Sequence, residues 1–134
     1  MRHRILVLGG YGNFGQPICR ALTQDADIEL LVGGRNAGKA NAFAGTLGAQ
    51  GLAIDAQAPD LAAQLRALGV ATLIHTAGPF QGQDYAVAEA CIAAGCNYLD
   101  LADGREFVAG IGALDERART AGVLATSGAS SVPA

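Results

Sequence analysis

The stretch from residue 4 to residue 22 reads RILVLGGYGNFGQPICRAL, an apolar run followed by a glycine-rich turn and a segment with helical signals. Within it, Gly10, Gly12 and Gly15 form the pattern G-x-G-x-x-G between an expected strand and an expected helix. The first glycine is expected to allow a sharp turn, the second the close approach of a pyrophosphate, and the third close packing of helix on strand. This order predicts a phosphate-binding turn at a helix N-terminus, and the alternative is a tight turn without a ligand.

Short apolar runs alternate with Ala-rich stretches at helical spacing along the rest of the chain. The expected strands are residues 4–9, 28–33, 51–55, 71–76, 98–102 and 123–127. Several of them are apolar without alternation, which is typical of strands covered by helices on both faces. The pattern predicts an α/β fold of the Rossmann type, with a doubly wound parallel sheet of about six strands, in one dinucleotide-binding domain over residues 1–134.

Helix boundaries are predicted from prolines and capping residues. Pro17 suits a first helical turn, so the first helix is expected to begin near Gln16. Asn36 is expected to cap a helix that ends at about Leu47, before Gly48. Further helices are expected from Pro59 or Asp60, over residues 84–95, and over residues 103–122.

The end of the second expected strand indicates which dinucleotide is bound. An NAD site usually places an acidic residue there to bind the ribose 2′-hydroxyl, whereas this chain reads VGGRN. Arg35 offers a guanidinium suited to a 2′-phosphate, so NADP is favoured over NAD. Asn36 is interpreted as a second phosphate ligand or as the helix cap, and one side chain can serve both purposes.

Two later strand ends add candidate residues. Asp55 follows the third strand, where it either meets the adenine edge or forms a turn. The small residues from Thr76 to Gly78, followed by Pro79, lie at the end of the fourth strand, where a flat ring can rest on the backbone. Cofactor contacts are therefore assigned to Gly10, Tyr11, Gly12, Asn13, Phe14, Gly15, Arg35, Asn36, Asp55, Thr76, Ala77, Gly78 and Pro79. His75 is interpreted as a core histidine.

Composition excludes several classes of partner. The net charge is −3, and the nine Lys and Arg residues are scattered, so neither nucleic acid nor a membrane surface is an expected partner. The chain contains no apolar run long enough to span a bilayer, and a cytoplasmic location is expected. The three cysteines lack metal-ligand spacing and are interpreted as buried thiols, so no metal site is expected.

Three segments, GGYGNFGQPICRAL, GPFQGQDYAVAEACIAAGCNYLDLADGREFV and AGVLATSGASSVPA, resemble the NADP-binding domain of the saccharopine dehydrogenase family. The resemblance is closest to the bacterial saccharopine dehydrogenase-like oxidoreductases. It implies hydride transfer between a nicotinamide cofactor and a small-molecule substrate. It also implies a second, substrate-binding domain after residue 134, so the chain resembles a truncated N-terminal module with little turnover of its own. Apolar surface near the last strand predicts self-association, with a homodimer as its simplest form.

Catalytic residues are not assigned. The resemblance to the lysine-forming saccharopine enzymes implies a Lys and His pair, but the only lysine, Lys39, lies on the second expected helix. Asp100 and Asp103 are interpreted either as an acid–base pair or as capping and loop residues. The alternative function is a redox sensor, because Gly9, Gly12 and Gly15 also give G-x-x-G-x-x-G, which resembles NmrA-like proteins that bind NADP without catalysis.

Overall fold

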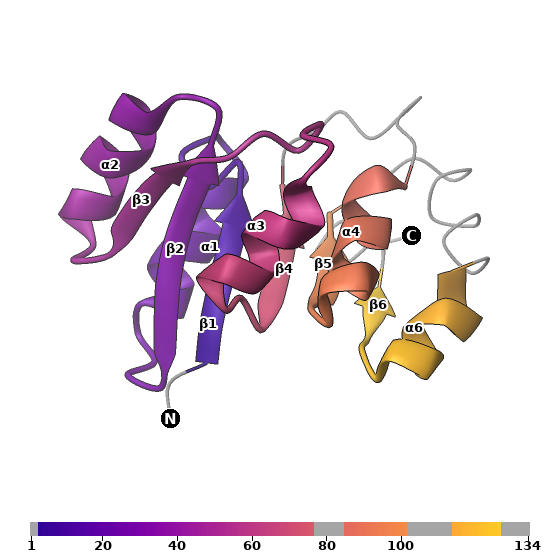
Figure 1. Cartoon of the computed structure of the whole chain (residues 1–134). Helices are drawn as coiled ribbons and strands as arrows, with labels where there is room; N and C mark the ends of the chain where they lie inside the picture. The colour runs from indigo at the N-terminus through magenta and orange to yellow at the C-terminus, as the bar shows by residue number, and fades with distance from the viewer. Residues whose placement is uncertain (1–2, 77–84, 102–113, 127–134) are drawn as a thin grey trace.

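A computed structural model of the chain describes residues 3–76, 85–101 and 114–126. Its strands are β1 (His3–Leu8), β2 (Ile28–Gly34), β3 (Gln50–Ala53), β4 (Thr72–His75), β5 (Asn97–Asp100) and β6 (Ala125–Thr126). Its helices are α1 (Gly15–Leu22), α2 (Ala37–Thr46), α3 (Leu61–Leu68), α4 (Ala86–Ala94) and α6 (Asp115–Ala121). The strands form one parallel sheet in the order β3-β2-β1-β4-β5-β6, which confirms the predicted Rossmann-type fold (Figure 1).

Helices cover both faces of the sheet, which explains why successive strand residues are buried. Leu6 packs into a core formed with α3, α4 and α6, whereas its neighbour Val7 packs into a second core formed with α1 and α2. Both side chains are fully buried. Figure 1 shows α3 and α4 in front of the sheet and α1 behind it. Each buried Leu or Val contributes about 1.5–3 kcal/mol, so the apolar runs stabilise both layers.

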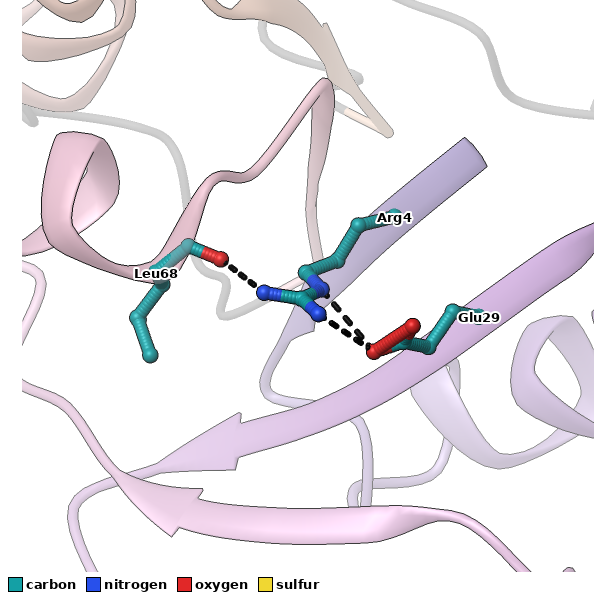
Figure 2. A network of polar contacts seen from close by, with 3 residues as sticks. All are labelled: Arg4, Glu29 and Leu68. Carbon is teal, nitrogen blue, oxygen red and sulfur yellow. Dashed lines mark hydrogen bonds and ion pairs between the residues drawn. The ribbon is translucent and has the colours of Figure 1, made fainter. Parts of the chain in front are cut away.

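Arg4 joins three elements at the N-terminal end of the sheet (Figure 2). It lies opposite Glu29 in the register of β1 and β2, and its Nη2 is 2.7 Å from Glu29 Oε2. The guanidinium also donates to the carbonyl oxygen of Leu68, the last residue of α3. Because the two charged side chains are 39% and 33% exposed, the ion pair contributes at most about 1 kcal/mol. This network fixes the edge of the sheet opposite the glycine-rich turn.

Most predicted helix boundaries agree with the structure. Gly48, Gly95 and Gly122 follow α2, α4 and α6 with positive φ angles of 67°, 71° and 73°, as expected for residues that end helices. Asn36 caps α2, because its Oδ1 accepts the backbone N–H of Lys39 at 3.0 Å. The last described helix begins at Asp115, and its proposed start at Asp103 lies outside the described residues.

Two strands differ from their predicted bounds. The third was expected over 51–55 and is Gln50–Ala53. The last was expected over 123–127 and begins at Ala125, two residues later, while residue 127 lies outside the described residues. All three cysteines are buried, as predicted. Within residues 3–76, 85–101 and 114–126, every helix is too short or too polar to cross a membrane.

Candidate dinucleotide-binding site

The topology brings the glycine-rich turn to the edge where parallel α/β sheets bind ligands. After β1 the chain crosses to β2 on one side of β1, whereas β4 pairs with β1 on its other side. In such folds the ligand crevice lies where the strand order reverses, which here is between the carboxyl ends of β1 and β4. Thr76 joins the two ends: its backbone N–H donates to Leu8 O at 2.9 Å, and its hydroxyl donates to the same oxygen at 2.7 Å. The turn after β1 is therefore anchored to the end of β4.

The sharp turn is made by Gly9, which corrects the prediction that Gly10 makes it. Gly9 has a φ of +81°, a left-handed conformation that favours glycine. Its N–H and that of Gly10 both donate to Gly33 O, at 2.8 and 3.3 Å. Gly10 instead serves close packing, since a Cβ there would lie 3.0 Å from Val32 Cγ1 and 3.1 Å from Cys19 Sγ.

Gly15 lets α1 touch the turn, in agreement with the packing role expected for the third glycine. A Cβ on Gly15 would lie 2.6 Å from Gly10 Cα and would also collide with Gly9 O. Gly12 differs from both, because it is exposed and its Cβ would meet only Gly9 O, at 3.2 Å. A bare backbone therefore faces outwards at Gly12, where a diphosphate needs room.

Three consecutive amides at the start of α1 are available to an anion. The N–H groups of Asn13, Phe14 and Gly15 donate to no described residue, whereas those of Gly12 and Gln16 donate to Gly9 O and Gly12 O. Asn13 is exposed, and so is Phe14, with 72% of its surface accessible. The positive end of the helix dipole adds to these donors, so the turn fits a phosphate group.

A second set of donors follows β2. Arg35 is exposed and forms no ion pair or hydrogen bond with any described residue, and Lys39 adds an exposed cation in the first turn of α2. Asn36 is exposed as well, and its side-chain oxygen is used for the cap. This end of the site therefore carries two positive charges that form no ion pair with a described residue, which suits a phosphorylated ribose.

Tyr11 connects the two sets of donors through a contact between its ring and Gly34. Gly34 is a residue that the sequence did not indicate as part of the site. A Cβ on Gly34 would lie 2.7 Å from Tyr11 Cζ, so the tyrosine ring rests directly on the Gly34 backbone. The Tyr11 hydroxyl accepts the backbone N–H of Asn36 at 3.2 Å. The only signal in the sequence was the pair of glycines before Arg35, which showed that the strand end lacks side chains.

The remaining candidates lie at the same edge. Asp55 is exposed after β3, and its Oδ1 accepts the N–H of Gln57 at 2.9 Å, so it forms a turn, one of its two predicted roles. Thr76 is buried against β1, as described above. Ala77, Gly78 and Pro79 lie outside the described residues.

The titratable side chains at the ends of β4 and β5 belong to the core. His75, Tyr98 and Asp100 are 2%, 1% and 0% exposed. The Tyr98 hydroxyl donates to Asp100 Oδ2 at 2.5 Å, and burial, followed by this hydrogen bond, raises the pKa of Tyr98 above its usual range. Asp100 therefore has a structural partner, and Asp103, its proposed companion in acid–base chemistry, lies outside the described residues. Among the residues that are described, no cluster of His, Cys, Asp and Glu has the form of a metal site.

Comparisons with known proteins agree with this geometry. The family profile described as "Saccharopine dehydrogenase NADP binding domain" matches residues 5–126. A search of the curated proteins finds no match. The profile covers the glycine-rich turn, Arg35 and every described strand and helix except the first two residues of β1.

Three solved structures illustrate the proteins that share this fold. Apo saccharopine dehydrogenase (L-Glu forming) from Saccharomyces cerevisiae aligns with a TM-score of 0.78 and 20% identity, over 95% of this chain and 27% of that one. Triphenylmethane reductase from Citrobacter sp., complexed with NADP(H), has a TM-score of 0.67 and 21% identity, over 92% and 48% of the two chains. GenD2 from gentamicin A biosynthesis, in complex with NAD, has a TM-score of 0.67 and 25% identity, over 95% and 34%. This chain thus spans less than half the length of each.

Proposed function

Because the chain belongs to the family of saccharopine dehydrogenase NADP-binding domains, we propose that it binds NADP(H) in preference to NAD(H) as the cofactor domain of an oxidoreductase. The observation that carries this proposal is the pairing of two anion sites at one sheet edge. One consists of the amides of Asn13, Phe14 and Gly15, and the other is the guanidinium of Arg35. A dinucleotide with a 2′-phosphate presents phosphates to both.

The preference for NADP(H) follows from the charge at the end of β2. A carboxylate at this position would bind the ribose hydroxyls of NAD and repel a 2′-phosphate, whereas Arg35 attracts the phosphate and can donate two hydrogen bonds to it. Lys39, exposed on the first turn of α2, adds a second positive charge. Asn36 orients the start of α2 as its cap, and its exposed amide group remains able to donate.

When bound, the nicotinamide cofactor supplies hydride exchange. The described residues hold its phosphates: the turn after β1 fixes the diphosphate, and Arg35 fixes the adenosine end. We place the small-molecule substrate in a second domain outside residues 1–134, because this chain spans only 27% of the yeast enzyme of the same fold. On this proposal the isolated chain binds cofactor and turns over little, since hydride transfer requires the substrate in near-attack geometry.

Replacing Arg35 tests the preference directly. We expect Arg35→Ala to weaken NADPH binding about ten- to a hundredfold, because charged hydrogen bonds to the 2′-phosphate are lost, and to leave NADH binding within about twofold. Isothermal titration calorimetry of both cofactors measures this. Arg117→Ala is the matched control, since Arg117 is an exposed arginine on α6 with a weak ion pair of 3.9 Å to Glu89.

The control variant should bind both cofactors as the original chain does. Equal affinities of the original chain for NADPH and NADH would contradict the preference for NADP(H). An Arg35→Ala variant that still binds NADPH more tightly than NADH would show that another residue binds the 2′-phosphate.

A second candidate function is a cofactor-binding sensor without catalysis, as in the alternative count of the glycines. The pattern G-x-x-G-x-x-G from Gly9 to Gly15 favours it, and the described titratable groups His75, Tyr98 and Asp100 are buried in the core. The two candidates differ in turnover: an enzyme oxidises NADPH in the presence of its substrate, whereas a sensor binds NADPH without consuming it.

A further inference from the structure

Tyr11 spans the distance between the two anion sites. Its backbone lies in the turn that carries the free amides, and its carbonyl oxygen accepts the side-chain amide of Gln16 on α1 at 2.7 Å. Its ring rests on Gly34, the last residue of β2, where even a methyl group would collide with the ring. The Tyr11 side chain is half-buried and packs against the core formed with α1 and α2.

The hydroxyl of Tyr11 then reaches past Gly34 to the residue after Arg35. It accepts the backbone N–H of Asn36 at 3.2 Å. Arg35 is thus held between Gly34, which lies under the ring, and Asn36, whose N–H is bound to the hydroxyl. The guanidinium forms no hydrogen bond or ion pair with a described residue, so these contacts fix the backbone that carries it.

We propose that Tyr11 is a positioning residue for cofactor specificity: it fixes the Arg35 turn relative to the diphosphate-binding turn so that one dinucleotide fits both. A guanidinium on a flexible turn must lose conformational freedom on binding, and a turn fixed beforehand loses less. This positioning strengthens binding of the 2′-phosphate and does not affect binding of the diphosphate. This inference rests on the proposed preference for NADP(H).

Two variants disturb the contact from opposite sides. Tyr11→Phe keeps the ring on Gly34 and removes the acceptor of the Asn36 N–H, whereas Gly34→Ala keeps the hydroxyl and displaces the ring. We expect each to lower the ratio of NADPH affinity to NADH affinity about three- to tenfold, with NADH binding unchanged within about twofold. Fluorescence titration of the whole chain with NADPH and with NADH gives both dissociation constants.

Tyr98→Phe is the matched control, because it removes a tyrosine hydroxyl at a distance from Arg35. Tyr98 lies in the core that α3 and α4 cover, and its hydroxyl donates to Asp100 Oδ2 at 2.5 Å. The variant should lower the melting temperature without changing the affinity ratio. If Gly34→Ala does not fold, Tyr11→Phe alone decides the result.

A double variant separates positioning from direct contact. Once Arg35 is replaced by Ala, Tyr11→Phe should cause no further change in the affinity ratio, because its effect passes through Arg35. Equal weakening of NADPH and NADH in Tyr11→Phe would overturn the positioning role, and so would a further loss of the ratio in the Arg35→Ala background. A starting chain without a preference for NADPH would overturn the proposed function instead, which is a different result.

Discussion

At Gly15, the first residue of α1 touches the turn that ends β1, and a side chain has no space. The atoms nearest to its absent Cβ belong to the backbone of Gly9 and Gly10, which cannot move aside as a flexible side chain can. Close contact of helix and turn also brings the N–H groups of Asn13, Phe14 and Gly15, which donate to no described residue, next to the end of β1. A single missing methyl group therefore supports the packing and, on our proposal, phosphate binding.

The variant Gly15→Ala tests this point. We expect it to lower the free energy of unfolding by about 1–3 kcal/mol, since α1 must shift away from the turn, and to weaken NADPH binding as the amides move. Gly45→Ala is the control, because Gly45 lies in α2 with no atom within 4 Å of a Cβ, and alanine there should stabilise the chain by about 0.5–1 kcal/mol. Urea denaturation measures both. Unchanged stability in Gly15→Ala would contradict the packing role.

Glycine roles were predictable from the sequence only in part. The spacing predicted close packing at Gly15, but GGYGNFG allows two ways to count the pattern, and the positive φ falls on Gly9 because the N–H groups of both Gly9 and Gly10 converge on Gly33 O. The contact between Tyr11 and Gly34 joins positions far apart in the chain, so no local pattern contains it.

At the level of elements, the start of α2 combines a structural cap with positive charge at the proposed cofactor site. Asn36 caps the helix and follows Arg35 directly, and the first helical turn contains Lys39. The N-terminus of this helix, like that of α1, presents partial positive charge to the sheet edge. A change at the cap can therefore affect the stability of the helix and the charge of the site separately.

Two substitutions of Asn36 separate these effects. Asn36→Ala should destabilise the chain by about 1 kcal/mol, because the N–H of Lys39 loses its acceptor. Asn36→Asp should keep the cap and the stability, but its carboxylate should repel a 2′-phosphate and weaken NADPH binding more than NADH binding. Thermal unfolding and calorimetric titration measure the two effects. If Asn36→Asp bound NADPH as tightly as the original chain, the 2′-phosphate would lie away from α2.

Elements were more predictable than contacts between them. The six strands follow from apolar runs, and the ends of α2, α4 and α6 follow from glycines that adopt positive φ. The last strand was predicted over 123–127 but begins at Ala125, because its pairing with β5 begins there, and residue 127 lies outside the described residues. The burial of Asp100 was not predictable either. Its hydrogen-bond partner Tyr98 lies two residues earlier on the same strand, and no sequence motif marks this pair.

At the scale of the whole molecule, the order of the strands decides where the proposed cofactor site lies. The order β3-β2-β1-β4-β5-β6 brings the turns after β1 and β2 side by side and sets the end of β4 against β1. The polar groups that we propose for cofactor binding lie at this edge, and the Arg4 network lies at the opposite edge. The second domain and self-association stay predictions.

The central claim is that the amides at the start of α1 bind the diphosphate of NADP(H). Titration of the ¹⁵N-labelled chain with NADPH, followed by amide chemical shifts in NMR spectra, tests it most directly, because the chain has only 134 residues. We expect the largest shifts at Asn13, Phe14 and Gly15, with Arg35 and Asn36 shifting for NADPH more than for NADH. Saturating NADPH that leaves the amides of Asn13 to Gly15 unshifted would contradict the account.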